Sequence, residues 1–385
     1  MSRSSNTDIF LYLQKSGIKM SQKNNSGLTV KQKKEHMTTL AKYREETLRP
    51  NPELRSLFLE ITPFCNEHCL HCGSRCGDID VKDMLTVEEI KDTLIQVKKD
   101  FDISKMRLCI TGGEPLLRPN FFEIMEFANN IGFGWGMTSN GTLITREVAR
   151  QLKKAGLRTV SISVDGLKEN HEWFRQSPGA YEKTIEGIKN LLAVKINHVQ
   201  ITTVVYHKNI NELDAMYEEF KKVGVRSWRV INIEPIGRAR ENEDLMLSKD
   251  EYIKMFDFIR EHRFDDKMEV TYGCSHFLGE DMEREVRKWY FLCNAGVYTA
   301  SIMYNGDIGG CLDIERRPEL VQGNIRKDNL KEVWEKKFEV FRNDYRKVGK
   351  CAECKHFDYC NSDSFHTWNF DKMEPNLCLK GILFN

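Results

Sequence analysis

Three cysteines lie within the eight residues CNEHCLHC (65–72), at positions 65, 69 and 72. The chain has 385 residues and 12 cysteines. Its first residues, MSRSSNTDIF, lack the apolar core of a signal peptide, and no apolar run has the length that crosses a bilayer. Because thiols stay reduced in the cytoplasm, we expect a cytoplasmic protein whose cysteines bind metal or take part in catalysis.

Composition narrows the possible partners. Charged residues make up 30% of the chain and hydrophobic residues 40%, an ordinary mixture for a folded protein. The formal net charge is +1. Such a balance gives no bulk attraction to nucleic acid or to an anionic membrane, so we expect neither as a partner.

Strand patterns and helix patterns alternate from residue 55 onward. Short β-branched or aromatic stretches precede amphipathic stretches with helical spacing. Thr86 with Glu89, and Ser248 with Glu251, form capping boxes. The predicted strands are 55–62, 106–111, 134–139, 159–165, 198–205 and 227–233, and the predicted helices are 86–101, 121–131, 146–156, 181–193, 211–224 and 249–262.

Repeated strand–helix units imply a parallel sheet with right-handed crossovers. The predicted units fall short of the eight of a closed barrel, so residues 55–265 are expected to form an α/β fold, a partial (β/α)6 TIM-like barrel. In such a sheet the active site lies at the C-terminal ends of the strands, where the cysteine loop follows the first strand. Residues 1–54 are expected to be a polar, partly helical extension, and residues 266–385 a small cysteine-rich α+β domain.

Three thiolates on one loop suit two kinds of metal centre. A structural zinc ion takes four ligands, and Cys76 or a histidine would have to supply the fourth. A cubane iron–sulfur cluster takes one thiolate for each iron. Three cysteines would then leave one iron open to a substrate or a cofactor.

Polar motifs follow or end the next three predicted strands: TGGEP (111–115), TSNGT (138–142) and SISVDG (161–166). Each motif alone is typical of a turn. In this order after a C-x3-C-x2-C loop, they resemble the radical S-adenosylmethionine (SAM) superfamily over about residues 55–260. The resemblance implies a [4Fe–4S] cluster on Cys65, Cys69 and Cys72, with SAM chelating the fourth iron.

The same resemblance implies roles around SAM. The two glycines let the backbone approach the amino group of SAM, Glu114 faces that ammonium, and Arg175 pairs with the carboxylate. Arg175 as a solvated loop residue is an equal alternative. Cys76 and Cys109 are expected to be structural. The implied SAM-binding set is Gly112, Gly113, Glu114, Ser139, Asn140, Ser163 and Arg175, and the loop NIEPIGRAR (232–240) is expected to pack on the adenine.

The C-terminal cysteines show a second pattern. Cys293 and Cys311 flank a predicted Asn-Gly hairpin, and C-x2-C-x5-C follows. This arrangement resembles the SPASM auxiliary-cluster domain, except that Ser364 stands where a further cysteine is usual. The resemblance implies one cluster on Cys351, Cys354, Cys360 and Cys378, and a second with only Cys274, Cys293 and Cys311. A zinc knuckle at 351–378 is the alternative.

The combined resemblance implies an enzyme that cleaves SAM reductively and oxidises or crosslinks a ribosomally made peptide. An electron donor such as flavodoxin or ferredoxin is implied as a partner. There are two alternatives within the same chemistry. The enzyme could oxidise a protein side chain, as in sulfatase maturation, or modify a tetrapyrrole or another small-molecule cofactor precursor. A zinc-binding module without catalysis is the third class, and it predicts a colourless protein rather than a brown one.

Overall fold

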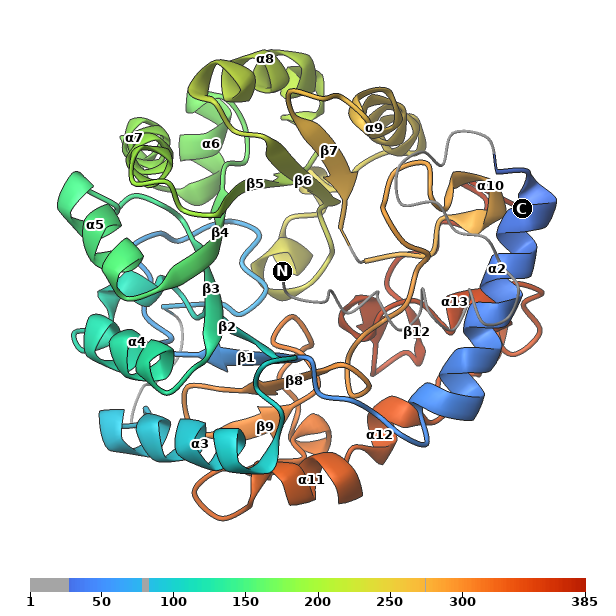
Figure 1. The fold of residues 1–385 in the computed structure, drawn as a ribbon. Coiled ribbons are helices and arrows are strands. Elements are labelled where there is room, and N and C mark those ends of the chain that lie inside the picture. Colours follow the sequence, from blue (N-terminus) through green and yellow to red (C-terminus); the bar gives the residue numbers. More distant parts are fainter. Residues whose placement is uncertain (1–27, 78–82, 274) are drawn as a thin grey trace.

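The computed structural model describes residues 28–77, 83–273 and 275–385 (Figure 1). Its main sheet has ten strands in the order β10-β9-β8-β1-β2-β3-β4-β5-β6-β7, so β10 and β7 are its edges and the barrel stays open. The strands from β1 to β7 pair in parallel. They are β1 (Ser56–Glu60), β2 (Arg107–Thr111), β3 (Gly134–Ser139), β4 (Leu157–Ser163), β5 (His198–Val205), β6 (Ser227–Asn232) and β7 (Glu269–Tyr272).

Helices surround the parallel strands on the outside of the ring (Figure 1). The predicted capping boxes begin two of them, at Thr86 and at Ser248. The barrel helices are α3 (Val87–Asp100), α4 (Phe121–Asn130), α5 (Arg146–Lys154), α6 (Lys168–Arg175), α7 (Ala180–Ala193), α8 (Leu213–Val223) and α9 (Lys249–His262). The predicted open α/β barrel is therefore confirmed, with its site edge at the C-terminal ends of the strands.

Two elements of the barrel were missing from the sequence prediction. The four-residue strand β7 pairs in parallel with β6, beyond the expected barrel end at residue 265. Helix α6 spans a stretch expected to be a loop, and Arg175 is its last residue. Arg175 is only 6% exposed, so the alternative of a solvated loop arginine is wrong.

The C-terminal segment continues the main sheet. Strand β8 (Thr299–Ile302) pairs in parallel with β1, and β9 (Asp307–Gly309) returns antiparallel to β8 through the predicted turn at Asn305 and Gly306. Strand β10 (Gly323–Asn324) completes this edge, and β11 (Trp368–Asn369) pairs separately with β12 (Glu374–Pro375). The short helices here are α10 (Gly279–Met282), α11 (Leu330–Lys336), α12 (Glu339–Arg342) and α13 (Phe357–Cys360).

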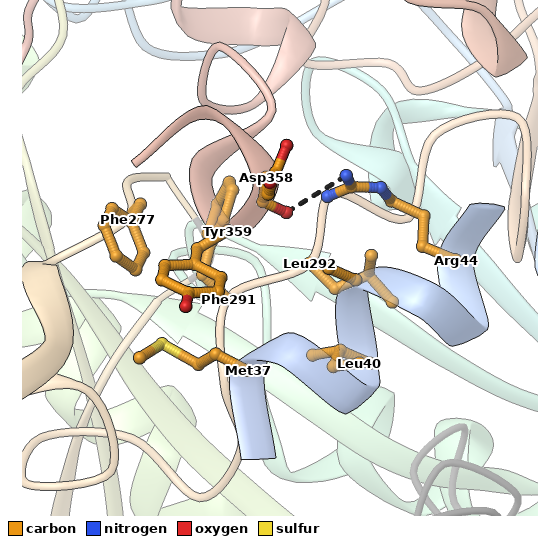
Figure 2. Close-up of a pocket in the computed structure, with 9 residues that line it drawn as sticks. Met37, Leu40, Arg44, Phe277, Phe291, Leu292, Asp358 and Tyr359 are labelled. Atoms are coloured by element: carbon orange, nitrogen blue, oxygen red, sulfur yellow. Dashed lines mark hydrogen bonds between the residues drawn. The ribbon is translucent and has the colours of Figure 1, made fainter. Parts of the chain in front are cut away.

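The N-terminal helix α2 (Val30–Tyr43) packs on this C-terminal segment. Met37 and Leu40 of α2 face Phe277 and Phe291 across a small cavity, and Arg44 donates to the carbonyl oxygen of Asp358 (Figure 2). The apolar contacts thus join the predicted extension to the cysteine-rich part of the chain. No helix in the described ranges has both the length and the apolar composition needed to span a membrane.

Candidate functional site

The loop with Cys65, Cys69 and Cys72 lies at the C-terminal edge of the sheet, directly after β1. Two of its backbone N–H groups bind helix α6: His68 donates to the carbonyl of Arg175 at 3.3 Å, and Leu70 to that of Phe174 at 2.9 Å. The loop is therefore anchored along its length to a helix of the barrel.

Arg238 anchors the other side of the cysteine loop. Its side chain donates to the carbonyls of Cys69 (2.8 Å) and Cys76 (3.1 Å), and its backbone N–H donates to that of Cys72 (3.1 Å). Gly237 precedes it with a φ of +52°, and a Cβ there would lie 2.2 Å from the Cys72 carbonyl oxygen. The loop after β6 therefore fixes the backbone of the cysteines, in addition to any contact with adenine.

The two glycines of TGGEP bring the loop after β2 against the cysteine loop. A Cβ on Gly112 would lie 2.2 Å from the Thr62 carbonyl oxygen, and one on Gly113 would lie 2.1 Å from that of Phe64. Glu114 N–H donates to the Phe64 carbonyl at 2.8 Å. Glycine is thus required here by backbone packing within the protein, whatever else approaches the motif.

The Glu114 side chain is buried against the TSNGT motif (138–142). Its carboxylate accepts hydrogen bonds from the Ser139 hydroxyl at 3.0 Å and from the Asn140 backbone N–H at 2.8 Å. The side chain is fully buried, and this burial raises its pKa to about 7 despite those hydrogen bonds. Glu114 therefore ties the second motif to the third.

Asn140 and Ser163 occupy the positions expected from the sequence. The Asn140 amide donates to the side chain of Asn66, next to Cys65, at 2.8 Å. Ser163 ends β4, half-buried, in register with Thr202 of β5. The three motifs and the cysteine loop are thus brought together at one edge, while contact of these residues with SAM stays a prediction.

Arg175 binds two protein carboxylates. Its guanidinium donates to Glu67 at 2.7 Å and to Asp165 at 2.9 and 2.7 Å. Although burial opposes its charge, these carboxylates hold the pKa of Arg175 well above its usual value. Glu67 belongs to the cysteine loop, so Arg175 fastens that loop to the end of β4 in addition to its predicted role with SAM.

An aromatic stack supports this corner. The His71 ring stacks on Phe174 with centroids 4.1 Å apart, and Phe174 stacks on Tyr206 at 3.9 Å. Burial lowers the pKa of His71 to about 4, so this ring is neutral at pH 7. The sequence shows His71 within the cysteine loop, but it does not show that His71 stacks on Phe174.

The three thiols differ in environment. Burial raises the pKa of Cys65 to about 11 and also raises that of Cys69. The neighbouring Cys76 thiol donates to Cys72, and this hydrogen bond lowers the pKa of Cys72 to about 5. Iron binding at Cys65 and Cys69 would therefore release protons.

Cys360, Cys351 and Cys378 lie near one another in the C-terminal segment, and Cys354 interacts with Cys351. After Cys360 the chain runs through Asn361, Ser362 and Asp363, all with positive φ between 52° and 63°. Buried Arg346 donates to the carbonyl oxygens of all three. This strained segment fixes the geometry beside the predicted cluster.

The second predicted auxiliary cluster is less complete. Cys274 lies outside the described residues. Ser364, at the usual cysteine position, is buried and donates its hydroxyl to the Ser275 carbonyl. Cys293 lies near Arg346, and the Cys311 thiol is 3.9 Å from Asp313. Ligation by Cys293 and Cys311 stays a prediction.

A buried network joins the barrel to the C-terminal segment. The His276 ring lies 2.6 Å from Glu234 and 2.9 Å from Asp363. Although burial opposes protonation, the two carboxylates raise the pKa of His276 to about 10. Glu234 follows β6, and Asp363 is 3.6 Å from the Cys360 thiol. Neither Glu234 nor His276 was chosen from the sequence.

The donor set fits iron–sulfur clusters. Within the described ranges, no three histidine, cysteine or acidic side chains converge as they would on a single metal ion. A cubane separates its thiolate ligands, since each binds a different iron. Three thiol donors on one loop suit such a cluster, and the glycine-dependent packing at Gly113 and Gly237 fixes the loop that carries them.

Comparisons with known proteins agree with this geometry. Residues 59–220 match the radical SAM superfamily, and residues 293–355 match the SPASM iron–sulfur cluster-binding domain. The AdoMet-dependent heme synthase of Methanosarcina barkeri is 29% identical over 80% of this chain and 90% of its own. The mycofactocin maturase MftC of Mycobacterium tuberculosis is 27% identical over 78% of this chain and 75% of its own.

Solved structures show the same fold. SuiB of Streptococcus suis bound to S-adenosylmethionine has a TM-score of 0.68 and 16% identity, over 98% of this chain and 87% of its own. The structure of anSMEcpe with bound AdoMet has a TM-score of 0.66 and 22% identity, over 84% and 90%. A radical SAM domain implies a [4Fe–4S] cluster with SAM, and a SPASM domain implies auxiliary clusters. The chain therefore carries a radical SAM domain followed by a SPASM iron–sulfur domain.

Proposed function

We propose that Cys65, Cys69 and Cys72 bind the SAM-binding cluster and that the enzyme oxidises or crosslinks a ribosomally made peptide. The observation that carries this proposal is the clamp on the cysteine loop. Arg238 holds it from the loop after β6, and Arg175 holds it from α6. Three thiols on a loop fixed at the strand ends leave one iron of a cubane for SAM.

When bound, the cluster and SAM supply the 5′-deoxyadenosyl radical that removes a hydrogen atom from a substrate carbon. The protein holds and orients these groups. Gly112 and Gly113 keep the loop after β2 close to the cysteines, and Glu114 positions Ser139 and Asn140 for SAM. Ser163 and Arg175 complete the proposed SAM site at the end of β4 and on α6.

The C-terminal segment would hold one auxiliary cluster on Cys351, Cys354, Cys360 and Cys378. Cys293 and Cys311, with Cys274, are proposed for a second. Reduction of the SAM-binding cluster requires an electron donor of the flavodoxin or ferredoxin type. Asp363 and Arg346 would fix the loop that carries Cys360, through its left-handed backbone.

Two structural neighbours that bind peptides support a peptide as substrate. SuiB was solved with the precursor peptide SuiA, and anSMEcpe with AdoMet and the Cp18Cys peptide. The relative from Mycobacterium tuberculosis is named a maturase. SuiB and anSMEcpe share the fold found here, each with a TM-score of 0.63 in these complexes.

A tetrapyrrole substrate is the second candidate. Relatives named AdoMet-dependent heme synthase and Fe-coproporphyrin III synthase align over 80% and 79% of this chain. Their identities, 29% and 26%, are in the range of the maturase, so sequence similarity alone does not separate the two substrate classes.

Anaerobic co-expression with a short peptide encoded beside the gene tests the proposal. We expect the peptide to lose two hydrogens by mass, and Cys72→Ala to abolish both this loss and SAM cleavage. Arg240→Ala is the control, because Arg240 is half-exposed and pairs with Glu315 at the surface. SAM cleavage by Cys72→Ala would overturn the cluster assignment. An unchanged peptide, in deuterated water as well, would favour a tetrapyrrole precursor as the next substrate to assay.

A further inference from the structure

The inner face of the open barrel, opposite the helices, is lined by polar side chains. On β6, Trp228 and Val230 are 0% exposed, and the Trp228 ring packs edge-on against Phe220 of α8 and Phe258 of α9. Arg229 lies between them in the strand, so its side chain points to the inner face. Arg229 remains partly exposed, as expected for a face that solvent reaches.

Among residues 28–77, 83–273 and 275–385, the hydrogen-bond partners of Arg229 are neutral. Its Nε donates to the Thr202 hydroxyl at 3.2 Å, and a terminal nitrogen donates to that of Ser161 at 3.4 Å. Within the described part of the chain it forms no ion pair. Other arginines at the site differ, because Arg175 binds Asp165 and Arg316 binds Glu60.

A second guanidinium increases the positive charge on this face. Arg107 of β2 donates to the Ser56 hydroxyl at 3.1 Å. Burial raises the pKa of the Cys109 thiol, and the charges of Arg107 and Arg229 both oppose this rise, so both guanidinium groups act on the same position of β2. Two guanidinium groups on one face of the sheet attract anions.

The acidic residues of the same face are already paired. Glu60 at the end of β1 binds Arg316. Glu269 on β7 binds Arg263 and, at 2.7 Å, Lys288. Neither carboxylate is within ion-pair distance of Arg229, so the described residues leave its charge for a molecule that enters the barrel.

We propose that Arg229 binds a carboxylate group of the substrate inside the barrel. This inference rests on the proposed function and narrows its substrate to one that carries a carboxylate near the reacting carbon. Guanidinium groups bind carboxylates through two parallel hydrogen bonds. The Arg229 guanidinium reaches the Ser161 hydroxyl, and Ser161 lies two residues before Ser163 on the same face of β4, so we place the bound carboxylate next to the proposed SAM site.

The carboxylate of SAM is a second carboxylate group that an arginine in this barrel could bind. Its expected partners are the open iron and Arg175, at the cysteine loop. The experiment therefore measures SAM and a substrate-like carboxylate separately. It uses the reconstituted enzyme with SAM bound, and glutarate as probe, with glutaramide as its uncharged counterpart.

Dissociation constants come from saturation-transfer NMR for the probes and from equilibrium dialysis for SAM. We expect Arg229→Ala to weaken glutarate binding about tenfold or more, and Arg229→Lys to weaken it less. Gln200→Ala is the matched control, because Gln200 lies on the same face of β5 without a charge. It should bind glutarate as the wild type does, and glutaramide should not bind.

Equal glutarate affinity in the wild type and in Arg229→Ala would overturn the proposal. A tenfold loss of SAM affinity in Arg229→Ala would also overturn it, since Arg229 would then hold the SAM carboxylate. Iron content and circular dichroism check that each variant is folded and contains its clusters. If Arg229→Ala is not folded or lacks clusters, the comparison of the wild type with Arg229→Lys still tests the proposal. Reductive SAM cleavage, measured in parallel, tests the proposed function independently, because it does not require the substrate carboxylate.

Discussion

The buried carboxylate of Glu114 accepts a hydrogen bond from the backbone N–H of Asn140 at 2.8 Å. It thereby connects the loop after β2 to the loop after β3. Gly113 connects the first of these loops to the cysteine loop, where its missing side chain allows contact with Phe64. Three loops from three strands thus form one rigid edge, which is the pre-organisation that a cofactor site requires.

Stability should depend on pH through Glu114. Its folded pKa of about 7 lies above the usual 4.5, so folding favours the protonated form. Stability is then fully present below about pH 4.5, and it falls by up to about 3 kcal/mol as the pH rises to about 7. Glu114→Gln, which stays neutral, should flatten this slope. Urea unfolding of the metal-free protein between pH 4.5 and 7.5 measures it, and parallel curves for both proteins would contradict the assignment.

Arg238 should be needed to position the cysteines. Arg238→Ala removes two side-chain hydrogen bonds to the carbonyls of Cys69 and Cys76 and should lower the iron bound by the first cluster. Arg240→Ala is the control, since Arg240 is half-exposed and pairs with Glu315 at the surface. Iron and sulfide assays, with the electron paramagnetic resonance signal of the reduced cluster, would show the difference. An unchanged signal in Arg238→Ala would mean that the loop keeps its shape without this residue.

The barrel could be predicted because its signal is local and repeated. Strands β1 to β6 and the helices α3 and α7 have strong periodicity, and Thr86 marks a helix start by its own side chain. Helix α6 could not be predicted because Leu167, at its start, cannot form a side-chain cap. Strand β7 could not be predicted because its four residues are too few to show a clear alternation of apolar and polar residues. The motif residues could be found because they follow strands.

The partners of the motif residues could not be predicted. Arg175 and Asp165 are ten residues apart, but Glu67 is more than a hundred residues from Arg175, and only the fold brings them together. Arg238 was visible in NIEPIGRAR, where a role with adenine was the simpler interpretation. Long-range hydrogen bonds of this kind leave no periodic trace in a sequence.

Asp363 should stabilise the contact between the barrel and the C-terminal segment, because it binds His276, which also binds Glu234. Asp363→Asn removes one of the two carboxylates that hold protonated His276, which is buried and 2.9 Å away. Leaving a buried charge partly unpaired costs about 3 kcal/mol. Urea unfolding at pH 7 should show this loss, whereas Asp371→Asn, at an exposed ion pair with Arg317, should leave the free energy of unfolding close to that of the wild type. Equal stabilities of the two variants would argue against a charged His276.

The auxiliary cluster should be separable from SAM cleavage. Cys360 lies in the C-terminal segment, while Cys72 lies in the loop after β1. We propose that the auxiliary cluster acts on the substrate after SAM has been cleaved. Cys360→Ala should therefore leave reductive SAM cleavage within about twofold of the wild type but strongly reduce formation of modified substrate. Cys72→Ala should abolish both. The measurements are 5′-deoxyadenosine by chromatography and product by mass spectrometry, with iron content for each variant. Unchanged product yield in a Cys360→Ala protein that has lost auxiliary iron would limit that cluster to a structural role.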